Sequence, residues 1–172
     1  MHPSVRHDIP AFSQYDIFLF RAGNHFTLYD KLGSHVIRDD SFSGVRFAVW
    51  APNAQSVSVV GDFNGWDPRA MPLAPRWDQS GVWEGAVGGV RPGALYKYRV
   101  VAKHGSARDK ADPFAFRCEV PPRTASVVHE HVHEWRDDGW MTSRASSTSL
   151  EAPLSVYEVH IGSWRRVSDE GN

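Results

Sequence analysis

The sequence lacks the features that mark secreted, membrane-bound or nucleic-acid-binding proteins. It has a single cysteine, Cys118, so no disulfide can form within the chain, which fits a reducing cytoplasm. The formal net charge is only −1, which gives no electrostatic reason to expect nucleic acid or an anionic membrane as a partner. The longest early apolar run, residues 17–20, is far shorter than the ~20 residues that span a bilayer. Residues 1–8 lack the apolar core of a signal peptide. We therefore expect a cytoplasmic protein.

The length and composition are those of one globular domain with extensions. The chain has 172 residues, of which 41% are hydrophobic and 23% are charged. It is too short for a complete (β/α)8 barrel, which needs ~200 residues or more. Cys118 lies in an apolar run that is typical of a strand, and we expect it to be a small core residue.

Short alternating segments predict a mainly β fold. In residues 45–51 the apolar side chains Val45, Phe47 and Val49 fall on one face of a strand. Further strands are expected at residues 57–61, 82–87, 94–101 and 113–120. Turn-forming pairs such as Asn64-Gly65 separate them, and no helical period intervenes. This pattern favours an immunoglobulin-like β-sandwich.

Changes in composition divide the chain into four parts. Residues 1–36 form a lead-in segment, which we expect to contain turns or one short helix packed on a neighbour. Residues 37–128 form the sandwich. Residues 129–152 are polar and rich in Ser and Thr, which is typical of a linker. Residues 153–172 begin with an apolar, strand-like run that has no later strand to pair with in this sequence.

Several motifs, in order, resemble one family of enzymes. They are found at residues 29–35 (Tyr-Asp-Lys-Leu-Gly-Ser-His), 44–54, 57–67, 95–98, 110–115, 121–126 and 157–166 (Tyr-Glu-Val-His-Ile-Gly-Ser-Trp-Arg-Arg). The first resembles the lead-in of bacterial glycogen branching enzymes. The middle ones resemble the glycogen-binding-type sandwich, carbohydrate-binding module family 48. The last resembles the first strand of the α-amylase-type catalytic barrel. The resemblance covers nearly the whole chain.

The resemblance implies a function in glycogen biosynthesis. Branching enzymes cut an α-1,4-glucan and rejoin the piece through an α-1,6 linkage with retention, which requires two carboxyl groups close together. In the family these groups lie at the ends of later barrel strands. The resemblance therefore implies no catalytic residue, cofactor or metal in this chain, which we expect to be inactive alone. Its expected partners are α-1,4-glucans (glycogen, amylose, maltooligosaccharides) and the missing catalytic barrel of the same polypeptide.

The candidate glucan site is the loop that carries Trp66. An indole in a polar loop can stack on a glucose ring, while Asn64 and Lys97 donate or accept hydrogen bonds with sugar hydroxyls. Glucan-binding members of the family usually offer a second tryptophan in the loop after the Tyr-Lys-Tyr strand, whereas residues 103–108 contain no aromatic residue. The alternative is that Trp66 packs the sandwich against the barrel. Trp83, inside a strand, is expected to pack in the core or at its rim.

A cluster of three histidines is compatible with a metal site, but we do not predict one. In a strand, His129, His131 and His133 share one face, and three imidazoles suit zinc. The segment adjoins the linker, and we expect exposed histidines instead. On the terminal strand, Glu158 and His160 share the face opposite Tyr157, and the role of His160 stays open between a support near the barrel site and a buried, hydrogen-bonded residue.

Two other functions compete with the branching enzyme. The first is a stand-alone α-glucan-binding module, against which the terminal motif at residues 157–166 argues. The second is the front end of another amylase-group enzyme, such as an isoamylase or a trehalose-releasing hydrolase. The motifs at residues 32–35 and 162–166 favour the branching enzyme over both of these enzymes.

Overall fold

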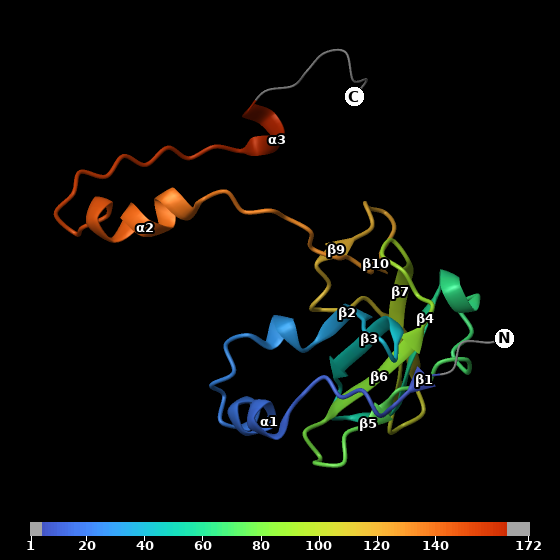
Figure 1. Ribbon diagram of the computed structural model, residues 1–172. Coiled ribbons are helices and arrows are strands. Elements are labelled where there is room, and N and C mark those ends of the chain that lie inside the picture. Colours follow the sequence, from blue (N-terminus) through green and yellow to red (C-terminus); the bar gives the residue numbers. More distant parts are fainter. Residues whose placement is uncertain (1–4, 165–172) are drawn as a thin grey trace. The chain divides into compact units, whose positions relative to one another are not determined.

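A computed structural model describes residues 5–164 of the chain (Figure 1). The chain divides into two compact units, Met1–His131 and Val132–Asn172. The larger unit contains every strand that the structure describes, and the smaller one contains two helices. No helix in the described part is long and apolar enough to cross a membrane.

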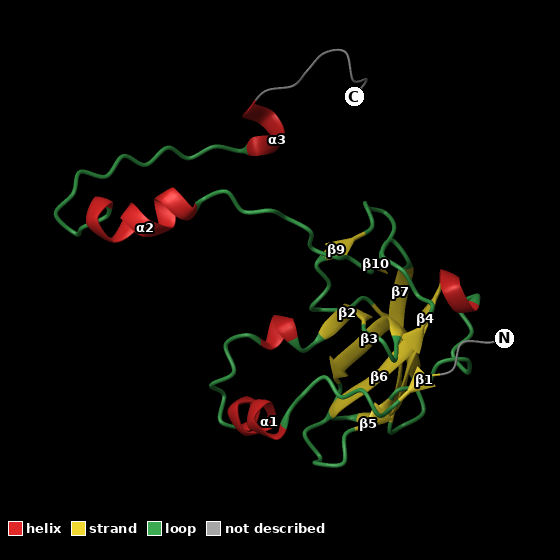
Figure 2. Ribbon diagram, in the orientation of Figure 1, coloured by secondary structure: helices red, strands yellow, loops and turns green. Residues whose placement is uncertain are grey.

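The larger unit is a sandwich of two antiparallel sheets (Figure 2). The first has the order β1 (Val5–Arg6), β6 (Val82–Gly88), β3 (Ser43–Trp50) and β2 (Gly33–Arg38), and β5 (Ala74–Pro75) also pairs with β6. The second has the order β4 (Ala54–Gly61), β7 (Leu95–Ala102), β10 (Ser126–Val127) and β9 (Arg117–Cys118), and β8 (Ala107–Lys110) pairs with β7. The predicted β-sandwich is confirmed. Strand β2 runs across residue 36, where we expected the lead-in to end.

The core lies between the two sheets and follows the predicted alternation. Val45, Phe47 and Val49 on β3 are buried, as are Tyr96 and Tyr98 on β7. Further members of this cluster come from β4, β6 and loop segments: Val57, Val59, Met71, Leu73, Trp83, Val87, Val90 and Val128. Burial of one such aliphatic or aromatic side chain contributes about 1.5–3 kcal/mol. Trp83 is therefore a core residue, as predicted, and its indole N–H donates to the carbonyl of Ala51 at 3.0 Å.

One carboxyl group is buried among the tyrosines of β7. Asp112 Oδ2 accepts hydrogen bonds from the hydroxyls of Tyr96, at 2.5 Å, and Tyr98, at 3.3 Å. Its other oxygen accepts from the backbone N–H of Phe114 at 2.8 Å. Burial raises the pKa of Asp112, although these hydrogen bonds oppose the shift. Burial likewise raises the pKa of both tyrosines, so each hydroxyl keeps its proton and donates it.

The lead-in folds onto the first sheet. Its helix α1 (Gln14–Arg21) begins at Ser13, whose hydroxyl accepts from the backbone N–H of Asp16 while the Asp16 carboxylate accepts from that of Ser13. A 3₁₀ turn, η1 (Leu28–Asp30), follows. A second apolar cluster joins the lead-in to β3 and β6: Ala11, Phe12, Ile17, Leu32, Ala48 and Val82. The predicted short helix packed on a neighbour is confirmed.

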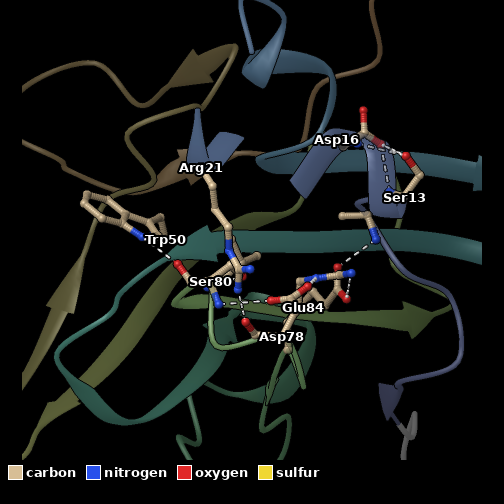
Figure 3. Close-up of polar contacts among 10 residues, drawn as sticks. Ser13, Asp16, Arg21, Trp50, Asp78, Ser80 and Glu84 are labelled. Atoms are coloured by element: carbon tan, nitrogen blue, oxygen red, sulfur yellow. Dashed lines mark hydrogen bonds and ion pairs between the residues drawn. The ribbon is translucent and has the colours of Figure 1, made fainter. Parts of the chain in front are cut away.

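Polar contacts fix the lead-in and the β5–β6 turn together (Figure 3). The Glu84 carboxylate on β6 accepts from the backbone N–H of Ala11 at 2.7 Å and from Arg76 Nη1 at 2.6 Å. Arg76 Nε also donates to Asp78 at 2.9 Å, and both side chains are buried. Arg21 of α1 donates to the carbonyl of Asp78. This turn is therefore held from inside by an ion network and from outside by α1.

Asp16 is the electrostatic centre of the lead-in. Its carboxylate contacts His25 Nε2 at 3.1 Å and Lys31 Nζ at 3.0 Å in addition to Ser13. Burial raises the pKa of Asp16, but the hydrogen bonds from Ser13, Lys31 and His25 together outweigh it, and the net pKa lies well below the ordinary value. A lowered pKa means that the charged form stabilises the fold. This contribution is present above the ordinary pKa of about 3.9 and is lost as the pH falls below it.

We expect Asp16→Ala to lower the free energy of unfolding by about 2–3 kcal/mol at neutral pH, because a helix cap and two contacts with basic side chains are lost. Urea unfolding of the variant and the wild type at pH 7 and pH 3 measures this. The difference should shrink at pH 3. The matched control is Asp30→Ala, which removes an exposed carboxylate of η1 and should cost little. A loss for Asp16→Ala as small as for this control would contradict the assignment.

Two predictions about the second sheet were wrong. The strand expected at residues 113–120 is reduced to the two-residue β9, and β8 was not predicted. Cys118 is exposed and not in the core, because β9 pairs only with the two residues of β10. The expected linker contains a helix, α2 (Asp138–Ser147), all of whose residues are exposed.

The segment expected to be the first barrel strand forms no strand in its described part, residues 153–164. It has no regular secondary structure up to residue 160 and ends in a single helical turn, α3 (Ile161–Trp164). Its apolar side chains are exposed, with Val156 80% and Tyr157 76% accessible. A strand requires hydrogen bonds to a neighbouring strand, and no described segment supplies them. Arg165 and Arg166 of the same motif lie outside the described residues.

Candidate functional site

The Trp66 loop leaves the sandwich at the end of β4. A 3₁₀ turn, η2 (Asp62–Asn64), leads into Gly65 and Trp66, whose φ angles are 62° and 61°. Glycine adopts this left-handed conformation readily, but for a tryptophan it costs about 1–3 kcal/mol. The backbone N–H of Trp66 donates to the carbonyl of Gly61 at 2.8 Å, which closes the loop. Trp66 is 39% exposed.

Asn64 holds this loop together. Its Oδ1 accepts from the backbone N–H of Gly61 at 2.9 Å, and its Nδ2 donates to the carbonyl of Val59 at 3.0 Å. Each of its two polar atoms therefore already has a backbone partner. A contact with a sugar hydroxyl would use the second amide hydrogen or the second lone pair of the oxygen. The prediction that Asn64 binds glucan stays a prediction, with a structural role beside it.

Lys97 lies at the same end of the second sheet. Gly61 pairs with Tyr96, and the Asp62 carboxylate accepts from the backbone N–H of Leu95 at 3.2 Å, so β7 begins beside the Trp66 loop. The Lys97 ammonium donates to the Thr124 hydroxyl at 2.7 Å. Two more donor hydrogens of the ammonium remain for a ligand. The three predicted site residues thus come from neighbouring parts of the same sheet end.

The loop in which the family usually has its second tryptophan, residues 103–108, contains no aromatic residue in this chain. The tip at residues 103–106 follows the far end of β7, where Ala102 pairs with Ala54. The eight residues of β7 span roughly 25 Å between that tip and the end beside Trp66. Whatever completes a glucan site around Trp66 must come from elsewhere on the sandwich.

A second aromatic surface lies between α1 and the β5–β6 turn. A cavity of about 560 Å³ is lined by Ile17, Phe18, Arg21, Ala22, Trp77 and Asp78, among others. The Trp77 side chain is 79% exposed, on a turn that the Arg76 ion network keeps rigid. Sequence patterns alone did not assign a place to Trp77, because α1 and this turn lie far apart along the chain.

The histidine cluster is not arranged as a metal site. Residues 129–137 form no strand. The rings of His129 and His131 lie 5.8 Å apart, and His133 packs edge-on against Trp135. Between residues 5 and 164, no group of three or more His, Cys, Asp or Glu side chains is placed to hold a metal ion.

Comparison with known proteins supports the sequence motifs. Residues 31–115 match the family carbohydrate-binding module 48, the isoamylase N-terminal domain. The 1,4-alpha-glucan branching enzyme GlgB of Aromatoleum aromaticum is 52% identical over 157 residues, which is 91% of this chain and 24% of that enzyme. The GlgB of Aquifex aeolicus is 50% identical over 161 residues, which is 93% of this chain and 25% of that enzyme.

The chain thus spans about a quarter of the length of the curated relatives that it matches. The match to the family model covers the strands from β2 to β8, which include the Trp66 loop and Lys97. The family match confirms the resemblance to carbohydrate-binding module 48, and the identity to the GlgB enzymes confirms the resemblance to the branching enzymes. Residues 31–115 thus form a carbohydrate-binding module 48 domain, and the chain is similar over nine tenths of its length to the N-terminal regions of 1,4-alpha-glucan branching enzymes.

Proposed function

We propose that this chain is the front part of a cytoplasmic glycogen branching enzyme and that its sandwich binds α-1,4-glucan at the Trp66 loop. The enzyme would cut an α-1,4-glucan and transfer the piece to form an α-1,6 branch. The glucan partners are glycogen, amylose and maltooligosaccharides. The names of the relatives and the carbohydrate-binding family support this assignment.

The observation that carries the glucan-binding role is the strained presentation of Trp66. A tryptophan in a left-handed conformation persists only where the surrounding structure holds it, and such positions cluster at functional sites. Here Asn64 and Gly61 hold the loop, and the exposed indole offers a flat apolar face at the end of the sheet from which Lys97 also comes. Stacking of such a face on a sugar ring, with hydrogen bonds at the ring's edge, is how aromatic side chains with a polar surround bind ligands.

We expect Trp66→Ala to lower the affinity for glycogen about tenfold or more, which corresponds to about 1.4 kcal/mol of lost stacking. Retardation in native gels containing glycogen measures the affinity. The matched control is Trp135→Ala, which removes another exposed indole, one that lies in the smaller unit. Equal retardation of the wild type and Trp66→Ala would contradict the role of this loop. No retardation of the wild type would contradict glucan binding altogether.

The exposed aromatic surface on α1 favours a second role, which is to brace the catalytic barrel. Tyr15 and Phe18 stack at 6.3 Å and are 67% and 66% exposed, and Trp77 lies beside the same cavity. Contiguous exposed apolar side chains are typical of surfaces that another domain covers. The barrel of the same polypeptide is the partner that we propose for this surface.

We expect this chain alone to form no α-1,6 linkages from amylose, because the proposed catalytic carboxylates belong to the barrel. Linkage analysis after incubation with amylose tests this, and new branch points would contradict it. On an enzyme that includes the barrel, the same analysis separates the alternatives. A branching enzyme raises the α-1,6 content of a glucan, whereas an isoamylase lowers it.

A further inference from the structure

A cavity next to the proposed glucan site has a chemistry that neutral glucan does not require. It has a volume of about 450 Å³, within the range of about 300–1,000 Å³ that small-molecule sites occupy. Leu95, Val127 and Arg117 lie in one row across β7, β10 and β9, because Val127 pairs with both of the others. Arg123 and the Pro121-Pro122 pair, from the turn between β9 and β10, line the same cavity.

The cavity carries an excess of positive charge. Among the residues that the structure describes, Arg117 makes no ion pair within 4.0 Å, and its side chain contributes to the lining. Arg123 Nη1 lies 3.8 Å from Glu119 Oε1, which is a long contact, and its side chain is 75% exposed. The second oxygen of Glu119 accepts from the backbone N–H of Ala125 at 3.0 Å. The cavity thus has two guanidinium groups and one carboxylate, and that carboxylate already accepts a hydrogen bond from the backbone.

Nearby charges do not cancel this excess. Asp62 accepts from the backbone N–H of Leu95, and Lys97 lies two residues further along β7. The negative charge of Asp62 and the positive charge of Lys97 cancel. The net charge at this end of the sheet therefore stays positive, because of the two arginines. Lys97 also donates to Thr124, the residue after Arg123, so the cavity and the proposed glucan contact share one turn.

We propose that this cavity binds the phosphate monoester of a hexose. Guanidinium groups present paired N–H donors that match phosphate oxygens, which makes arginine the usual residue for phosphate recognition. Leu95, Val127 and Pro121 offer an apolar lining for the C–H face of a sugar ring. The phosphate part of the proposal stands on the two arginines. The sugar part rests on the proposed glucan function, since the cavity adjoins the Lys97–Thr124 contact.

The single cysteine provides a local readout. Cys118 is exposed and directly follows Arg117 on β9, so its alkylation by iodoacetamide is sensitive to a ligand bound at Arg117. We expect glucose 6-phosphate at twice its dissociation constant to slow alkylation about threefold, as for a site that is two-thirds occupied. Glucose at the same concentration should leave the rate unchanged. The double variant Arg117→Gln/Arg123→Gln should lose the protection, and the control Arg108→Gln, an exposed arginine of β8, should keep it.

Calorimetric titration of the same proteins gives the dissociation constant independently. No saturable binding of glucose 6-phosphate, or protection that survives in the double variant, would overturn the proposal. Protection by inorganic phosphate as strong as by the sugar phosphate would overturn the sugar part. Comparison with 6-phosphorylated maltooligosaccharides shows whether the ester is carried on a glucan or is free. Because Trp66→Ala and neutral glucan are not used, failure here leaves the proposed function standing.

Discussion

Replacement of Asp112 by alanine should destabilise the sandwich more than removal of any surface carboxylate, by about 3–5 kcal/mol. The hydroxyl of Tyr96 and the backbone N–H of Phe114 lose their acceptor in this variant, whereas the hydroxyl of Tyr98 keeps the carbonyls of Ala48, at 3.3 Å, and Gly33, at 3.4 Å. Tyr96 and Tyr98 are 0% exposed, so water cannot replace the lost bonds without opening the core. Urea unfolding followed by tryptophan fluorescence gives the free energy of unfolding.

Asp109→Ala is the matched control for this prediction. Asp109 binds Arg99 at the surface of β8, and exposed pairs of this kind contribute about 1 kcal/mol or less. Asp112→Asn adds a test of the pKa. Burial raises the pKa of Asp112 above its unfolded value, so the wild type should lose stability relative to Asp112→Asn as the pH rises through this pKa. A difference that moves the other way with pH, or equal losses for Asp112→Ala and Asp109→Ala, would contradict the account.

Gly61→Ala should both destabilise the second sheet and disturb the Trp66 loop. A Cβ atom at Gly61 would overlap the carbonyl oxygen of Leu95 on β7 and would lie 2.6 Å from Phe63 Cε1. A backbone oxygen cannot turn aside as a side chain can, so β4 and β7 must separate at the base of the loop. Overpacking of this kind costs about 1–3 kcal/mol, and more where the backbone must move. We expect the affinity for glycogen to fall together with the stability.

Gly88→Ala tests whether the loss of stability and of affinity for glycogen is specific to position 61. Gly88 is also at the end of a strand, β6, but a Cβ atom there meets only Phe42 at 3.8 Å, an ordinary contact. This variant should stay within about 0.5 kcal/mol of the wild type and should bind glycogen normally. Crystal or solution structures of both variants would show the Trp66 loop displaced only in Gly61→Ala. An undisplaced loop and unchanged stability in Gly61→Ala would refute the argument.

The sequence predicted those strands whose residues alternate between the core and the surface. Residues 45–51 and 94–101 carry a period of two because one face of each strand is buried between the sheets, whereas residues 82–87 are buried on both faces. Strand β8 has no such signal, since all four of its residues are exposed. Helix α2 gave no helical period for the same reason, and its Ser- and Thr-rich composition indicated a linker. Where all residues of a strand or helix are exposed, burial does not select residue types, and the local sequence pattern does not reveal the element.

The candidate site was predictable only in part. The Asn-Gly pair before Trp66 indicated the turn, but the left-handed backbone of Trp66 and the two backbone contacts of Asn64 depend on how β4 ends. The position of Lys97 beside the loop follows from the register of β4 and β7, which no local pattern contains. The α1–Trp77 cavity and the arginine cavity likewise join segments that are distant in sequence.

The most direct test of the account is a titration of this chain with maltoheptaose, followed by the NMR signals of the backbone amides and of the tryptophan indole N–H groups. The account predicts saturable shifts of the Trp66 indole and of the amides of Gly61, Asn64 and Lys97, and their loss in Trp66→Ala. Indoles of the smaller unit, Trp135 and Trp140, should not move. Saturable shifts elsewhere with an unmoved Trp66 indole, or no shifts at all, would contradict the central claim that this loop binds α-glucan.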